Sequence, residues 1–270
     1  MWPSAEGRGG SGRYRRGMAE PRPVVADYPG CPETVTAAVA QGRVLRSPRW
    51  GLWDVVGTLV SMVLLGGAAS ASLAMIGASV GAVVIVGSLA GWVGLAGWPM
   101  MATRLRGNGP RIDLGLSLSW REARLGVGVG LVALFAAAIV TAISAAVFGE
   151  FDSTAGDLAR EMQGEGNRLA MIAFGLAIVV GAPIAEELAF RGLLFASLRK
   201  RGVGPVATVV LTAVAFSLFH FEPVRIAVLL TIGLILGAAR ARSGSLGVSI
   251  VAHAVNNAPG AIFVILGLQG

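Results

Sequence analysis

The stretch VVGTLVSMVLLGGAASASLAMIGASVGAVVIVGSLAGWVGLAGWPMMAT, residues 55–103, decides the fold class because it contains no charged side chain. One membrane crossing needs roughly 20 apolar residues, so this stretch is long enough for two crossings. Backbone groups in lipid must bond internally, and the alternating pattern of a membrane barrel is absent from the sequence. Five further apolar runs follow, at residues 125–149, 169–198, 202–221, 226–239 and 246–268. The sequence therefore predicts an all-α, polytopic transmembrane helical bundle of seven spans, with eight as the alternative.

The composition agrees with a membrane protein, because 54% of the residues are hydrophobic and only 14% are charged. A net charge of +7 could indicate a nucleic-acid partner. However, the arginines fall in tails and connecting loops beside apolar runs, where the membrane surface explains them better. We expect the lipid bilayer as a partner, and no nucleic acid.

The charges of the connecting segments alternate along the chain. Basic segments precede the first span, connect the second span to the third, and recur at 199–201 and 240–242. The segments between them are uncharged (77–80) or acidic (150–168, five acids against two arginines). Basic loops favour the cytoplasm, so this pattern predicts a cytoplasmic N-terminus and an external C-terminus. One lysine against 21 arginines suggests a GC-rich genome, and hence a bacterial inner membrane.

Four regions follow from these patterns. Residues 1–49 are expected to form a disordered basic cytoplasmic tail, in which Met1 or Met18 is the true start. The tail holds the single cysteine, Cys31, which can form no internal disulfide. Residues 50–149 are expected to form an N-terminal three-helix part, residues 150–168 an acidic loop, and residues 169–270 a second transmembrane domain.

The second domain contains EELAFRG (186–192), which places three charges in an apolar run. Left unpaired, they would cost on the order of 9 kcal/mol on insertion scales. Glu187 and Arg191 are four residues apart and share a helical face, so they can neutralise each other. Glu186 is turned about 100° away and remains available. Pro183 should weaken the helix and leave backbone carbonyls available for polar contacts.

The chain's two histidines, His220 and His253, also lie in apolar runs, and Asn257 shares a helical face with His253. If the runs on either side of the RKRG turn are antiparallel, Glu186 and His220 lie roughly 24 to 27 Å along their helices, at nearly the same level. Counting from the next basic turn brings His253 and Asn257 toward the same layer. Intramembrane ionisable groups are functional candidates by default, so we expect these groups to converge.

Simpler interpretations stay open. A buried histidine can be a packing residue, and a Glu–Arg pair can merely lock two helices. Phe216, Phe219 and Phe221 are expected to pack, and Asp54 to serve the start of a helix. Ser217 lies near His220, but no acid–His–Ser series accompanies it. Glycine pairs such as Gly126 and Gly130 permit close helix packing, for which use within one chain is favoured over dimerisation. The oligomeric state remains open.

The motifs EELAFR (186–191), FSLFH (216–220) and HAVNN (253–257) resemble the EExxxR, FxxxH and HxxxN motifs of the CPBP family of intramembrane endopeptidases. That family includes type II CAAX prenyl proteases and bacteriocin-processing and immunity proteins. The resemblance covers about residues 169–260. It implies a catalytic CPBP-like domain and a protease that hydrolyses peptide bonds of membrane-associated substrates.

The resemblance also implies roles. Glu186 would be the general base, and His220 would help to hold the water. His253 and Asn257 would supply oxyanion donors, while Arg191 would pair with Glu187 and orient the site. A bacterial membrane-associated peptide is the expected substrate.

A metal is the open question for this chemistry. Glu186, His220 and His253 would be a legitimate zinc set. The HExxH spacing is absent, however, and asparagine is a poor zinc ligand, so we favour a site without a metal or other cofactor.

Two other classes of function remain possible. An ion-coupled transporter would also place charges at mid-membrane, although no inverted repeat is visible. A non-catalytic immunity or scaffold protein would retain the fold. Cleavage of a membrane-anchored substrate that depends on Glu186 would separate the endopeptidase from both.

Overall fold

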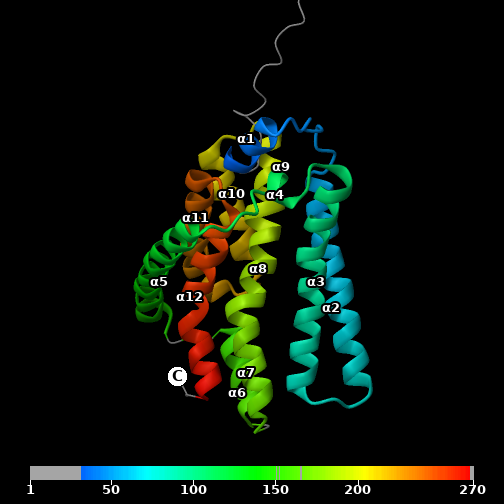
Figure 1. The fold of residues 1–270 in the computed structure, drawn as a ribbon. Coiled ribbons are helices and arrows are strands. Elements are labelled where there is room, and N and C mark those ends of the chain that lie inside the picture. Colours follow the sequence, from blue (N-terminus) through cyan, green and yellow to red (C-terminus); the bar gives the residue numbers. More distant parts are fainter. Residues whose placement is uncertain (1–31, 150, 152, 165, 268–270) are drawn as a thin grey trace, which may run out of the picture.

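The computed structural model describes residues 32–267 except 150, 152 and 165, and this part contains helices and no strands (Figure 1). Within these described residues, six helices are long and apolar enough to cross a membrane, and α10 is a shorter apolar helix. They are α2 (Leu52–Met75), α3 (Val80–Arg106), α5 (Trp120–Phe148), a composite helix at Arg168–Lys200, α10 (Pro205–Phe219), α11 (Ile226–Ser243) and α12 (Leu246–Leu266). The described residues thus form an all-α bundle that is compatible with the predicted seven spans.

The hairpin of α2 and α3 is held together by small residues. A Cβ added at Gly94 would lie 2.6 Å from the backbone of Ser61 and Met62, and one at Gly66 would lie 3.2 Å from Gly91 Cα. Lipid supplies no hydrophobic drive between helices, so close backbone approach of this kind stabilises their pairing. On its other side α3 packs against the composite helix, where Leu95 is buried beside Ala185 and Phe190.

The helix α5 packs on α12 through two glycines. A Cβ at Gly126 would lie 2.6 Å from Val251 Cβ, and one at Gly130 would lie 2.6 Å from Val255 Cβ. The glycine pair is therefore used for packing within the chain, as its sequence context favoured. Through this contact α5 supports the helix that carries His253 and Asn257.

Two short helices differ from the expected disordered tail and acidic loop. The helix α1 (Pro32–Ala40) buries Val35 and Ala38 against Ile112, which belongs to α4 (Pro110–Asp113). The helix α6 (Thr154–Gly164) buries Met162 against Ala170 and Phe174. A few apolar residues at helical spacing suffice for this docking, although the segments around them are charged. Cys31, Met1 and Met18 lie outside the described residues.

Asp54 is a structural residue, as expected. It lies in the first turn of α2, where its carboxylate accepts a hydrogen bond of 2.9 Å from the Gly51 N–H. The same carboxylate accepts a hydrogen bond of 3.2 Å from Trp98 Nε1 and pairs with Arg106. These contacts tie the beginning of α2 to the end of α3.

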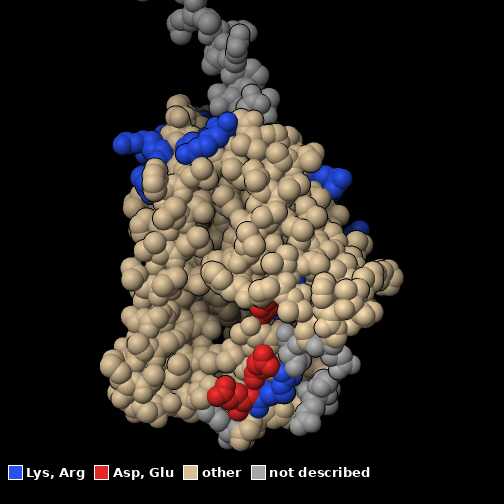
Figure 2. Space-filling view, turned by 180° about the vertical axis from the view of Figure 1, so that it is seen from behind, with Lys and Arg blue, Asp and Glu red and all other residues tan. Residues whose placement is uncertain are grey.

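The charged side chains are distributed unevenly between the two ends of the bundle (Figure 2). Lys and Arg side chains gather at the end that holds α1, α4 and α9 (Phe195–Lys200), whereas Asp and Glu side chains, with arginine beside them, gather near α6. The folded chain therefore sorts its charges as the sequence pattern predicted. The side that faces the cytoplasm remains a prediction.

Candidate active site

The composite helix Arg168–Lys200 contains two π-helical turns around the pair of glutamates. Its parts are α7 (Arg168–Leu176), η1 (Ala177–Gly181), α8 (Ala182–Glu187), η2 (Leu188–Leu194) and α9. In η1 the Ala182 N–H donates to the Ala177 carbonyl, five residues earlier. The next bond in that series would need an N–H on Pro183, which proline lacks. The Ile178 carbonyl instead accepts a hydrogen bond of 3.2 Å from Asn257 Nδ2. The expectation that Pro183 leaves a carbonyl for a polar contact is confirmed.

Glu187 and Arg191 form a buried ion pair, as their spacing predicted. Arg191 Nη1 donates to Glu187 Oε1 at 2.7 Å, and both side chains are 0% exposed. His253 Nδ1 contacts the same carboxylate oxygen at 3.0 Å. Because a carboxylate oxygen can only accept, this contact places a proton on Nδ1 of His253. One carboxylate thus fixes both a cation and a histidine ring.

Phe216 lies at the centre of these groups. The guanidinium of Arg191 lies 4.3 Å from the centre of the Phe216 ring, within the range of a cation–π contact. The ring centres of His220 and His253 lie 4.6 and 5.7 Å from the same ring. Phe216 was expected to be a packing residue, and its packing positions both histidines.

Glu186 faces the cavity, unlike its neighbour. Its side chain is 13% exposed, whereas that of Glu187 is fully buried. Glu186 Oε2 lies 3.8 Å from His253 Nε2, which is longer than a direct hydrogen bond and suits a bridging water. The two adjacent carboxylates thus have different surroundings, as the 100° rotation between them predicted.

His220 follows the last residue of α10 and has a defined tautomer. Its Nδ1 lies 2.8 Å from the Phe216 carbonyl oxygen, which can only accept, so Nδ1 carries the proton. In the neutral ring Nε2 then has a lone pair that can accept a hydrogen bond from water. Phe221, the next residue, has a φ of +54°, and no other non-glycine residue in the described part has a positive φ. The chain therefore turns sharply directly after His220.

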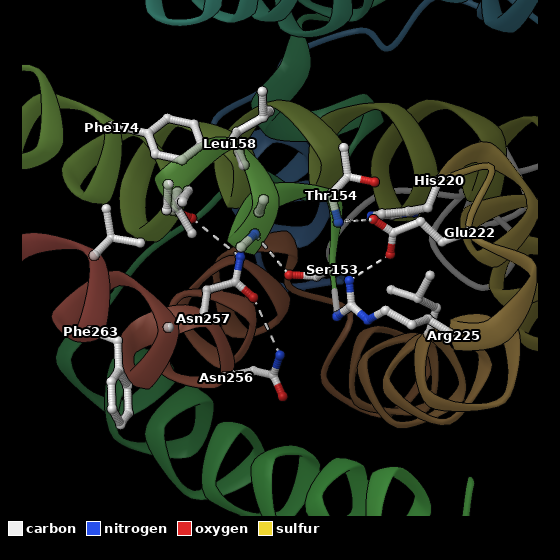
Figure 3. Close-up of a pocket in the computed structure, with 18 of the residues that line it drawn as sticks. Ser153, Thr154, Leu158, Phe174, His220, Glu222, Arg225, Asn256, Asn257 and Phe263 are labelled. Carbon is white, nitrogen blue, oxygen red and sulfur yellow. Dashed lines mark hydrogen bonds and ion pairs between the residues drawn. The ribbon is translucent and has the colours of Figure 1, made fainter. Parts of the chain in front are cut away.

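Asn257 is held on α12 by two hydrogen bonds. Its Nδ2 donates to the Ile178 carbonyl, and its Oδ1 accepts a hydrogen bond of 3.3 Å from Asn256 Nδ2 (Figure 3). The amide carries two N–H groups, and only one of them is needed for Ile178. The arrangement leaves the second N–H for a ligand.

These groups line one cavity of about 660 Å³. Glu186, His220, His253 and Asn257 all belong to its wall, together with Trp92 from α3. The predicted convergence of the four polar groups is therefore present. A cavity of this size is typical of a ligand site. Figure 2 shows the molecule hollowed on the face seen there, toward its acidic end.

The cavity mouth is closed on one side by the beginning of α6. Glu222 accepts a hydrogen bond of 2.9 Å from the Thr154 N–H and pairs with Arg225 at 2.5 Å, so its carboxylate lies between the two (Figure 3). Burial by itself raises the pKa of Glu222. The hydrogen bonds from Thr154 and the charge of Arg225 outweigh it, so the pKa falls below its ordinary value of 4.5. The ionised carboxylate of Glu222 thus holds the first residue of α6 in place; we call this contact the latch between Glu222 and Thr154.

A protein metal site needs several ligands that converge on one ion. Among the described residues, no three His, Cys, Asp or Glu side chains are grouped so that they could hold an ion. Of the predicted zinc set, Glu186 and His253 approach each other, but His253 Nδ1 is already directed to Glu187. Metal dependence remains a prediction to be tested.

Several residues of the site were not predicted from the sequence. Trp92 comes from a helix with no motif, and the Thr154–Glu222 contact joins the beginning of α6 to the segment after α10, far away in sequence. Asn256 could have been found as the direct neighbour of Asn257. Ser217, which was not favoured as a nucleophile, donates its hydroxyl to the Val214 carbonyl of its own helix at 3.0 Å.

Comparison with known proteins identifies one match. Residues 168–259 match the family model of the type II CAAX prenyl endopeptidase Rce1-like proteins. Neither the curated proteins nor the solved structures gave a match. The matched segment extends from the beginning of α7 into α12 and contains all six predicted site residues.

Proposed function

We propose that the protein is an intramembrane endopeptidase in which Glu186 activates a water to hydrolyse peptide bonds of membrane-associated substrates. The match of residues 168–259 to the type II CAAX prenyl endopeptidase Rce1-like family supports this proposal. The observation that carries the proposal is the pairing of adjacent glutamates in opposite environments. Glu187 is buried and engaged by Arg191 and His253, while Glu186 faces the cavity.

The first step is attack by water on the scissile carbonyl. Glu186 takes a proton from the water as general base, and His220 holds the water through the lone pair on Nε2. The hydrogen bond from His220 Nδ1 to the Phe216 carbonyl supports this role, because it leaves Nε2 as the acceptor. Glu186 Oε2 and His253 Nε2 lie 3.8 Å apart, so a water that bonds to both lies to one side of the line that joins them.

The second requirement is stabilisation of the oxyanion on the attacked carbonyl. Asn257 donates its remaining N–H to that oxygen, and His253 donates from Nε2 when its ring is protonated. With Nδ1 already directed to Glu187, a second proton on His253 makes Nε2 a donor. Glu186 then returns its proton to the leaving amine, and the tetrahedral intermediate collapses.

The buried pair supports this chemistry without contacting the substrate. Arg191 neutralises Glu187, and Glu187 orients the His253 ring. The expected substrate is a bacterial membrane-associated peptide. We place the protein in a bacterial inner membrane with the N-terminus in the cytoplasm, as the charge pattern favours.

The test uses the full chain in liposomes and a pool of fluorogenic peptides that carry an acyl anchor. Wild type should cleave members of the pool, and Glu186→Gln should reduce the rate by about 10² or more. Glu161→Gln serves as the matched control, because Glu161 is an exposed acid on α6 and should leave the rate unchanged. Equal cleavage by wild type and Glu186→Gln would sink the mechanism. No cleavage by wild type would favour a scaffold or a transporter.

A further inference from the structure

Asn256, which occupies one of the unspecified positions of the HxxxN motif, lies beside the group proposed to bind the oxyanion. It precedes Asn257 on α12, and both side chains line the cavity. Asn256 Nδ2 donates to Asn257 Oδ1 at 3.3 Å (Figure 3). Its own Oδ1 is buried with no hydrogen-bond partner among the described residues. The bond to Asn257 is therefore the one that a substitution of Asn256 would remove.

The two contacts of Asn257 select the same orientation of its amide. The Ile178 carbonyl can only accept, so it requires an N–H, while the amide nitrogen of Asn256 donates and so requires an oxygen. Rotation of the Asn257 amide by 180° would break both hydrogen bonds. It would also present a carbonyl oxygen where the oxyanion forms, which would repel the developing charge.

We propose that Asn256 is a positioning residue that fixes the amide of Asn257 with an N–H directed at the oxyanion. This inference rests on the proposed endopeptidase function and adds a residue to it. Asn256 acts through Asn257 and does not contact the reacting atoms. Ile178 performs the same task from the motif helix, so loss of Asn256 weakens the orientation without abolishing it.

The expected effect is on the rate of the chemical step. Loss of one neutral hydrogen bond corresponds to about a tenfold change, so Asn256→Ala should lower kcat about tenfold. KM should remain within about twofold, because the amide is needed mainly in the transition state. Asn257→Ala should lower kcat by about 10² to 10³, as for loss of one oxyanion donor. In the Asn257→Ala background, Asn256→Ala should have no further effect.

A control separates positioning from packing. Ser249 lies on the same helix, is fully buried, and donates to the Leu236 carbonyl at 3.3 Å. Ser249→Ala therefore also removes a buried hydrogen bond from α12, but one without a link to Asn257. The kcat of Ser249→Ala should stay within about twofold of wild type. Ser249→Ala should change kcat by the same factor whether residue 257 is asparagine or alanine. Thermal unfolding of each variant in detergent checks that Asn256→Ala loses no more stability than Ser249→Ala.

The double-mutant cycle is measured on the anchored fluorogenic peptides, beside wild type and Glu186→Gln. If cleavage depends on Glu186 but the losses from Asn256→Ala and Asn257→Ala multiply, the positioning role is wrong and the proposed function stands. An unchanged kcat for Asn256→Ala would likewise exclude the positioning role and leave the proposed function standing. If cleavage is absent or independent of Glu186, the proposed function fails and the positioning role fails with it.

Discussion

Replacement of Arg191 by methionine should destabilise the fold much more than removal of a comparable ion pair near the surface. Arg191 and Glu187 are both 0% exposed and joined at 2.7 Å, so Arg191→Met leaves a buried carboxylate without its cation. Breaking a buried pair in this way costs about 3–5 kcal/mol. The variant also loses the contact with the Phe216 ring and a hydrogen bond of 3.3 Å to the Gly233 carbonyl. His253 Nδ1 still donates to Glu187, so we expect a loss near the lower end, about 3 kcal/mol.

The assay is unfolding in mixed detergent, followed by the fluorescence of the six tryptophans. Arg225→Met is the matched control, because Arg225 also pairs with a glutamate but is 27% exposed, and such a pair contributes about 1 kcal/mol or less. Adding Glu187→Gln to Arg191→Met should recover much of the loss, since no buried charge then remains unpaired. A loss for Arg191→Met that is no larger than for Arg225→Met would refute the reasoning.

Four further predictions follow from other parts of the structure. Gly130→Ala should destabilise the bundle and lower activity, because its Cβ would lie 2.6 Å from Val255 Cβ, whereas Gly128→Ala meets nothing within 4 Å and should be neutral in the same unfolding assay. The latch between Glu222 and Thr154 should persist at neutral pH: the folded pKa of Glu222 is lowered, so its contribution is fully present above the ordinary value of 4.5 and is lost as the pH falls through the folded value. Hydrogen exchange at the Thr154 amide checks this, and Glu222→Gln should remove the acid dependence. A strong chelator should leave peptide cleavage unchanged, and a loss that zinc alone reverses would show that a metal is required. In a Cys31→Ser background, a membrane-impermeant thiol reagent should label Gly164→Cys but not Gly204→Cys in intact cells, because Gly164 lies at the acidic end and Gly204 at the basic end; both positions have open space for a side chain. The opposite labelling pattern would invert the topology.

The number of spans was predictable because lipid imposes a simple rule on length and charge. Runs without charges must be helical and of a minimum length, so their count required no knowledge of packing. The helices α1 and α6 were not predicted, because this rule applies only to membrane spans. Each buries only one or two side chains, such as Val35 or Met162, within a charged segment, and that signal is too weak to separate a docked helix from a loop.

The candidate site was predictable in its members and less so in its contacts. Counting residues from the RKRG turn predicted that Glu186 and His220 lie at the same level, because the rise per residue of a helix is fixed. The partner of His253 Nδ1 was not predictable, since the choice between two adjacent glutamates depends on how the helix is turned. Trp92 reaches the cavity through tertiary packing alone.

The two π-helical turns separate the length of the motif helix from its orientation. Each such turn accommodates one more residue than an α-helical turn, so the α-helical parts on either side keep nearly the rotation that they would have in a regular helix. Loss of a single residue from η1, such as Val180, would therefore restore regular winding and leave α7 turned much as it is relative to the glutamates. In a regular helix the same deletion would rotate every residue beyond it by about 100°. The helix that carries the glutamates can thus lose a residue at η1 or η2 and still direct its motif toward α10 and α12.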